Sequence, residues 1–201
     1  MSLQTLLALA GFVFVMSISP GPGNFLLLAS GANFGFARSV PLILGISVGF
    51  LSIVFLVGVG LGPVFERWPE IYLALQIACG VYVLWLAWKI ASSRSLGSGE
   101  AKVDEPVGFI AAAMLQLFNP KAWAVALIVT VSYTAPERLL LSLALVLAVI
   151  AVVNIPALSV WALSGAALRQ ALSRGRRIVI FNIAMAVLLL VSMAPVFLPF
   201  A

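Results

Sequence analysis

Two proline-containing segments inside apolar sequence carry the polar groups most able to do chemistry. The first is Ser19-Pro20-Gly21-Pro22-Gly23-Asn24, and the second is Asn119-Pro120-Lys121. Because prolines remove backbone donors and glycines lower the cost of non-helical dihedrals, we expect both segments to interrupt a helix. In hydrocarbon, the backbone groups freed by a break must be paired within the protein or line a wet cavity, so such a break usually faces a site.

The chemistry these segments favour is the binding of a carboxylate. A half-helix that begins near Pro22 would direct its first amides and the positive end of its dipole at an anion. Lys121 adds an ammonium group near the middle of an expected span, where a cation costs roughly 2.5–3.5 kcal/mol and no Asp or Glu is available to neutralise it. Its partner is therefore expected to be backbone carbonyls, water or a bound carboxylate. The alternatives are a simple proline kink at a packing contact and a lysine that snorkels to the interface.

Other polar positions give weaker signals. Side-chain amides within the expected spans, such as those of Gln116 and Asn182, usually form hydrogen bonds between helices. Of these residues we retain only Asn154 as a candidate for substrate binding. Asn154 precedes Pro156, which suggests another break. The segment Gly45-Ile46-Ser47-Val48-Gly49 matches a nucleophile-elbow pattern. With no histidine to take the serine proton, its small residues four apart favour helix packing instead.

Composition defines the class of protein. The chain has 201 residues, of which 64% are hydrophobic and 8% charged, whereas a soluble domain carries roughly 25% charged residues. No histidine and a single cysteine are present, so we expect no catalytic residue, no metal site, no cofactor and no intramolecular disulfide. Since a membrane helix needs about 20 apolar residues, the uncharged runs predict an all-α integral membrane protein, a single membrane domain over 1–201. Its six spans are expected at about 4–30, 40–62, 71–89, 107–132, 139–166 and 178–198.

The six expected spans divide into two groups of three. The Ser/Gly-rich, charged segment 91–106 separates 1–90 from 107–201 and is typical of a linker. Because three is odd, a structural duplication must place the halves in opposite orientations, which predicts a 3+3 inverted repeat. Pro20 and Pro120 stand 100 residues apart, so the first and fourth helices are expected to be broken at equivalent places.

Basic residues predict the orientation. With the N-terminus outside, eight lie in cytoplasmic connections and two outside, a strong positive-inside bias. Both termini are therefore expected to be extracytoplasmic in a bacterial inner membrane. The basic run 169–177 could instead suggest nucleic-acid or lipid-headgroup binding, but topogenic charge explains it and no nucleic-acid partner is expected. The cytoplasmic residues are Arg38, Lys89, Arg94, Lys102, Arg169, Arg174, Arg176 and Arg177, and the outside ones are Arg67 and Arg138.

Several motifs, taken in order, resemble the LysE/RhtB amino-acid exporter family. They are Ile18–Asn24, Ala32–Phe36, Gly45–Phe50, Gly80–Ile90 and Phe118–Trp123. The resemblance covers most of the chain, and the residues of these motifs are most similar to those of the cysteine/O-acetylserine exporter-like branch. It implies a six-helix inner-membrane secondary transporter with an inverted repeat that exports amino acids or their derivatives using the proton gradient.

One departure from the family bears on the substrate. Many relatives have an acidic residue in the second span where this chain has Phe50, which disfavours cationic substrates and removes the usual candidate for proton coupling. We therefore expect export of small neutral amino acids across the lipid bilayer by alternating access. The carboxylate would be held by Lys121 and the amides of 22–24, with Asn119 and Asn154 supplying hydrogen bonds. The alternatives are a non-transporting assembly protein and an intramembrane enzyme, and a homodimer through small-residue faces stays open.

Overall fold

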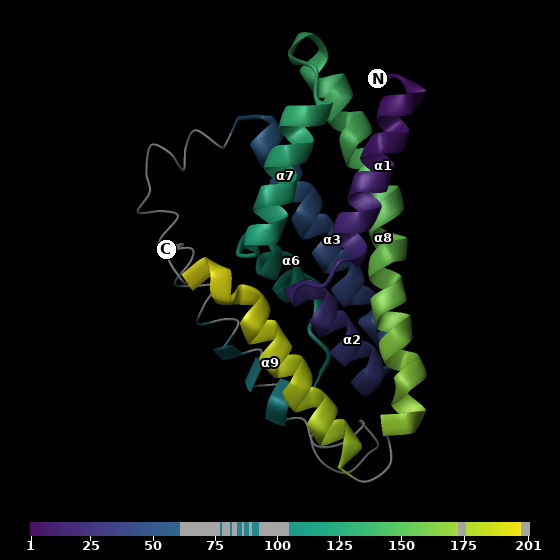
Figure 1. The fold of residues 1–201 in the computed structure, drawn as a ribbon, viewed down its shortest axis with the longest axis vertical. Coiled ribbons are helices and arrows are strands. Elements are labelled where there is room, and N and C mark those ends of the chain that lie inside the picture. The colour runs from purple at the N-terminus through teal and green to yellow at the C-terminus, as the bar shows by residue number, and fades with distance from the viewer. Residues whose placement is uncertain are drawn as a thin grey trace.

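The computed structural model describes residues 1–60, 77, 81, 84–85, 87–88, 90–92, 105–172 and 176–197. All regular structure within these ranges is helical (Figure 1). The expected third span, 71–89, and the expected linker, 91–106, lie largely outside the described residues. The helices are α1 (Leu3–Ile18), α2 (Pro22–Phe34), α3 (Phe36–Gly58), α6 (Phe109–Leu117), α7 (Pro120–Tyr133), the 3₁₀ turn η1 (Pro136–Arg138), α8 (Leu139–Leu172) and α9 (Arg177–Phe197).

Two helix pairs are broken where the sequence predicted. The axes of α1 and α2 differ by 60°, and those of α6 and α7 by 69°. Each pair joined across its break is long and apolar enough for one membrane span, as α3 and α8 are on their own. The described residues therefore contain two continuous candidate spans, or four when the broken pairs are counted. In Figure 1 both breaks lie near mid-height, while α8 runs the length of the molecule.

The break expected next to Asn154 is absent. The helix α8 runs without interruption from Leu139 to Leu172 with Pro156 inside it. A single proline removes one backbone donor, and membrane helices tolerate this loss when neighbouring groups satisfy the freed carbonyls. The first break differs because two prolines and two glycines fall within Ser19–Asn24. The second differs because Asn119 directly precedes Pro120 and its side chain caps α7, whereas the Asn154 side chain bonds to Ser17 instead.

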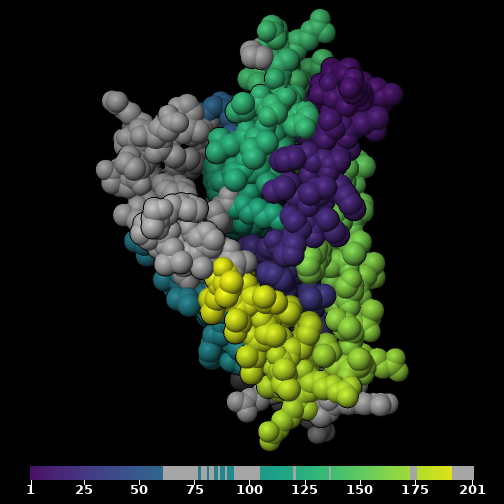
Figure 2. All heavy atoms as spheres, in the orientation of Figure 1, coloured from purple at the N-terminus to yellow at the C-terminus, as the bar shows by residue number. Residues whose placement is uncertain are grey.

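The broken pairs pack reciprocally on the two continuous helices. The pair α1 and α2 packs on α8, and the pair α6 and α7 packs on α3. The helix α9 lies across α2, where Asn33 and Asn182 exchange two buried hydrogen bonds of 2.8 and 3.1 Å. Figure 2 shows α9 covering the lower part of one face, with α1 and α7 in contact above it. Each broken pair is thus held by the continuous helix of the other half.

Glycines permit the closest helix contacts. A Cβ on Gly45 would lie 2.3 Å from the Phe109 carbonyl oxygen, and one on Gly49 would lie 2.6 Å from that of Ala113. The expectation that 45–49 packs helices is therefore confirmed, and this face of α3 is covered by α6. On the other side, Gly31 and Gly165 bring α2 and α8 together in the same way.

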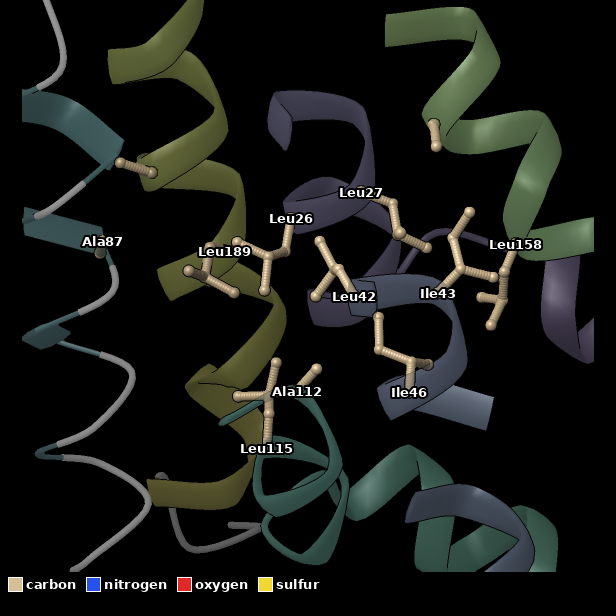
Figure 3. Close-up of a cluster of buried hydrophobic side chains, with 12 residues drawn as sticks. Leu26, Leu27, Leu42, Ile43, Ile46, Ala87, Ala112, Leu115, Leu158 and Leu189 are labelled. Atoms are coloured by element: carbon tan, nitrogen blue, oxygen red, sulfur yellow. The ribbon is translucent and has the colours of Figure 1, made fainter. Parts of the chain in front are cut away.

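The core consists of two apolar clusters. One lies among α2, α3, α6, α8 and α9, where its side chains point toward one another (Figure 3). The other lies among α1, α3, α7 and α8 and includes Leu9, Phe50, Val129 and Ile150. Because α3 and α8 contribute to both clusters while each broken pair divides between them, the boundary between the clusters falls at the breaks.

We predict that Gly165→Ala destabilises the contact between α2 and α8. Its Cβ would lie 2.1 Å from the Leu28 carbonyl oxygen, so the helices must separate, at a cost of about 1–3 kcal/mol. The apparent Tm of the detergent-purified protein should fall. Gly11→Ala is the matched control because no atom lies within 4 Å of its new Cβ, and its Tm should be unchanged or slightly higher. Equal Tm values for the two variants would contradict this packing.

Candidate functional site

The first break is closed by a side chain from the helix that follows it. The helix α1 ends at Ile18, and α2 begins with Pro22 at its first position, where the missing proline N–H costs nothing. The Asn24 amide nitrogen donates to the carbonyl oxygens of Ser17 at 2.9 Å and Ser19 at 2.7 Å. Asn24 is buried, and its side chain therefore satisfies carbonyls that the end of α1 leaves without helical partners.

The second break is closed in a similar manner. Asn119 is the N-cap of α7, and its side-chain oxygen accepts from the Lys121 backbone N–H at 3.1 Å, as expected of an asparagine at this position. Pro120 occupies the first position of α7. The Trp123 indole N–H donates to the Leu117 carbonyl oxygen at 2.7 Å. The end of α6 is thus tied to the first turn of α7.

Lys121 connects the two breaks. Its ammonium nitrogen lies 2.8 Å from the Ser19 carbonyl oxygen, 2.7 Å from the Ser19 Oγ and 3.4 Å from the Pro20 carbonyl oxygen. These are three uncharged oxygens for the three N–H donors of an ammonium group. Of the partners considered for this lysine, the structure shows backbone carbonyls, supplemented by one hydroxyl.

A cavity of about 60 Å³ lies between the breaks, enough for a few water molecules. The helices α1, α2, α3, α6, α7 and α8 all contribute to its wall. Polar side chains meet there with apolar ones from both clusters, so the cavity sits at the boundary between the two parts of the core. Its lining residues are Val13, Met16, Ser17, Gly21, Gly23, Asn24, Ile46, Phe50, Gln116, Asn119, Lys121, Ala122, Val125, Asn154 and Leu158.

The structure brings most of the predicted site residues to this cavity. Ser19 and Pro20 do not line it but contact the Lys121 ammonium. Pro22 and Pro120 begin the two half-helices. The predicted residues that line it are Gly21, Gly23, Asn24, Asn119, Lys121 and Asn154.

The expectation of free amides throughout 22–24 is wrong. The backbone N–H groups of Asn24 and Phe25 both donate to the Gly21 carbonyl oxygen at 3.0 Å, and Pro22 has no N–H. The first turn of α2 therefore folds back on its own N-cap residue. Within the described residues, the Gly23 N–H is the amide of this turn with no acceptor.

Asn154 joins α8 to the end of α1. Its amide nitrogen donates to the Ser17 Oγ at 2.9 Å, which is the interhelical bond that we weighed against a binding role. Its side-chain oxygen is buried and has no partner within the described part of the chain. Asn154 thus makes one structural bond and leaves one acceptor at the cavity wall.

Two polar residues that line the cavity, Gln116 and Ser17, were not predicted as site residues. Gln116 was taken as an ordinary interhelical amide, and Ser17 was not singled out. Gln116 lies one helical turn before Asn119 and accepts from its amide nitrogen at 3.3 Å. A polar side chain one turn away from a break shares the same helix face as the break, and that spacing is the signal that could have identified it.

These features define a class of protein. Apolar helices with two broken pairs that meet at a shared polar cavity are an architecture typical of membrane transporters. The family model for LysE type translocators matches residues 14–198. The chain therefore belongs to the LysE family: it is a multi-pass inner-membrane transport protein and not an enzyme.

Relatives with similar sequences are named cysteine/O-acetylserine efflux proteins. The one from Salmonella choleraesuis is 29% identical over 189 residues, 92% of this chain and 94% of the relative. The one from Escherichia coli O139:H28 is 30% identical over 190 residues, with the same shares covered. The one from Klebsiella pneumoniae is 36% identical over 110 residues, 55% of each chain. No solved structure matches this chain significantly.

We predict that Asn24→Ala destabilises the first break. The substitution leaves the carbonyls of Ser17 and Ser19 without the Asn24 donor, and a buried unsatisfied group costs about 1–3 kcal/mol. A lower apparent Tm in detergent is the expected result. Ser52→Ala is the control, because the Ser52 hydroxyl also donates to a backbone carbonyl but at an exposed position on α3. An Asn24→Ala variant as stable as this control would show that Asn24 does not hold the break.

Proposed function

We propose that this protein exports small neutral amino acids or their derivatives across the bacterial inner membrane by alternating access, driven by protons moving inward. Family membership and the efflux function named for its relatives support amino-acid export. The observation that carries the site assignment is the Lys121 ammonium, which reaches from the second break to Ser19 at the first. A cation that is shared by two breaks and lines a cavity suits an amino-acid carboxylate.

The carboxylate competes with protein oxygens for Lys121. A carboxylate forms a stronger, charge-assisted hydrogen bond with an ammonium group than a carbonyl does. Substrate binding would therefore exchange the contacts to Ser19 and Pro20 for contacts to the carboxylate. The Gly23 N–H, at the positive end of the α2 dipole, supplies a second donor.

We assign the substrate ammonium group to Asn154, which also lines the cavity. The Asn154 side-chain oxygen is a buried acceptor without a partner in the described residues, so an ammonium group bound there satisfies it. Phe50 also lines the cavity, and its ring offers no negative charge to a second cationic group. An amino acid with a small, uncharged side chain matches this combination.

The packing supports alternating access. We propose two three-helix repeats of opposite orientation, 1–90 and 107–201, joined by the linker 91–106 within one membrane domain. The reciprocal contacts of α1 and α2 with α8, and of α6 and α7 with α3, are those expected of such a repeat. Because one apolar cluster lies on each side of the cavity, opening either cluster would expose the site to one side of the membrane.

Charge supports the orientation of the protein. Arg169 lies at the corner between α2 and α3, where its Nη1 is 3.5 Å from the position of a Gly35 Cβ. Arg38 follows the same corner, and Arg176 and Arg177 precede the body of α9, which begins at this end of the molecule (Figure 1). We propose that this end is cytoplasmic and that both termini are extracytoplasmic, in keeping with the positive-inside rule.

We predict that Lys121→Ala strongly reduces export. Losing a charge-assisted bond to the carboxylate should lower uptake per folded carrier by roughly ten- to a hundredfold. The measurement is uptake of labelled O-acetylserine, cysteine, lysine and glutamate into everted vesicles, with and without an acidic lumen. Wild-type uptake should favour the neutral amino acids and increase with the acidic lumen.

Arg138→Ala is the control for this experiment, because it removes a cation at an exposed position at the end of η1. It should transport as wild type does. Normal uptake by Lys121→Ala would reject the site assignment. If the wild type transports none of these compounds and Lys121→Ala only reduces the amount of folded protein, an assembly role is favoured.

We predict that Phe50→Glu shifts the preference toward basic amino acids. The new carboxylate would face the cavity and provide a partner for a substrate side-chain cation. Competition between labelled lysine and unlabelled neutral amino acids in everted vesicles measures the shift. Phe50→Leu changes the size of the side chain without adding charge and should leave lysine excluded. An unchanged lysine preference in Phe50→Glu would show that Phe50 does not face the substrate.

A further inference from the structure

We propose that Gln116 is a specificity-determining residue that selects substrates whose side chain carries an uncharged hydrogen-bond acceptor. The Gln116 side-chain nitrogen is buried, and no acceptor for it is present among the residues the structure describes. The side chain is 4% exposed and lines the cavity. This inference rests on the proposed function, because it assigns a part of the substrate to a part of the same cavity.

A chain of hydrogen bonds fixes which end of the Gln116 amide is free. The Lys121 backbone N–H can only donate, so the Asn119 atom that it contacts at 3.1 Å must be the oxygen. The other end of the Asn119 amide is then the nitrogen, which donates to the Gln116 oxygen at 3.3 Å. The remaining Gln116 atom is therefore the nitrogen. The cap of α7 thus determines that the Gln116 nitrogen, and not its oxygen, is the end of the amide left without a partner.

The free nitrogen is directed at the start of α2. It lies 3.3 Å from the position that a Cβ on Gly23 would occupy. A side chain at position 23 would crowd this nitrogen, so the glycine lets the Gln116 amide lie against the start of α2 at the wall of the cavity. Ile46 borders the same position, also at 3.3 Å, so one polar donor stands in a mostly apolar wall.

A buried donor without a partner discriminates strongly between ligands. A substrate oxygen that accepts this N–H relieves the cost of the unsatisfied group, whereas a hydrocarbon side chain seals it from water. The donor is uncharged, so it does not compensate the desolvation of an anionic side chain. The matching substrates are small amino acids with a hydroxyl or ester oxygen, in preference to aliphatic amino acids of the same shape.

The test compares O-acetylserine with homoleucine, its hydrocarbon isostere. Uptake of each is measured in everted vesicles containing the wild type, Gln116→Met or Gln170→Met. Methionine keeps the length of glutamine and removes the donor, together with the oxygen that accepts from Asn119. The preference for O-acetylserine should fall roughly three- to tenfold in Gln116→Met, the worth of one hydrogen bond. Gln170→Met changes an exposed glutamine near the end of α8 and should keep the wild-type ratio.

A second measurement separates selectivity from folding. For detergent-purified Gln116→Met, the rise in Tm produced by O-acetylserine should shrink while that produced by homoleucine is retained. If Gln116→Met keeps the wild-type preference in both measurements, the inference is overturned and the proposed function stands. If the wild type transports neither compound nor any other amino acid, the proposed function fails, and the inference fails with it.

Discussion

The structure depends on one constraint, which is that a backbone break inside hydrocarbon must have its polar groups satisfied by the protein itself. At each break a side chain from the following half-helix binds the end of the preceding one: Asn24 at the first and Trp123 at the second. Lys121 then joins the two breaks through Ser19. Because Lys121 at the second break donates to the Ser19 oxygens at the first, each half of the chain alone would lack hydrogen-bond partners that the other half provides.

This arrangement relates substrate binding to the state of the breaks. A ligand shifts a conformational equilibrium only as far as it binds one state better than another. The contacts of Lys121 with Ser19 and Pro20 join the two breaks. In the proposed mechanism a carboxylate takes over the ammonium, releases the first break from the second, and removes a restraint on the movement of one repeat against the other.

The sequence predicted the features that depend on local residues. Both breaks and the packing role of Gly45 and Gly49 were predicted correctly, because proline, glycine and small-residue spacing act over a few residues. The predicted break at Pro156 is wrong because the Asn154 side chain bonds to Ser17 and caps no new helix, so the proline alone does not end α8. The contacts of Lys121 with Ser19, 102 residues away, could not be predicted. They arise from tertiary packing, as does the free nitrogen of Gln116, which depends on the cap at Asn119.

The cavity divides recognition between two sets of elements. The breaks supply groups suited to the parts that all amino acids share, namely the Lys121 ammonium and the Gly23 amide for the carboxylate. In the proposed site, α8 supplies the Asn154 oxygen for the ammonium group, which all amino acids also share, while α3 and α6 supply Phe50 and Gln116 for the variable side chain. A substitution in the first set disturbs the satisfied backbone on which the fold depends, whereas one in the second set alters a wall that packing already holds in place. In the proposed mechanism, selectivity can therefore change through α3 and α6 while the breaks stay the same.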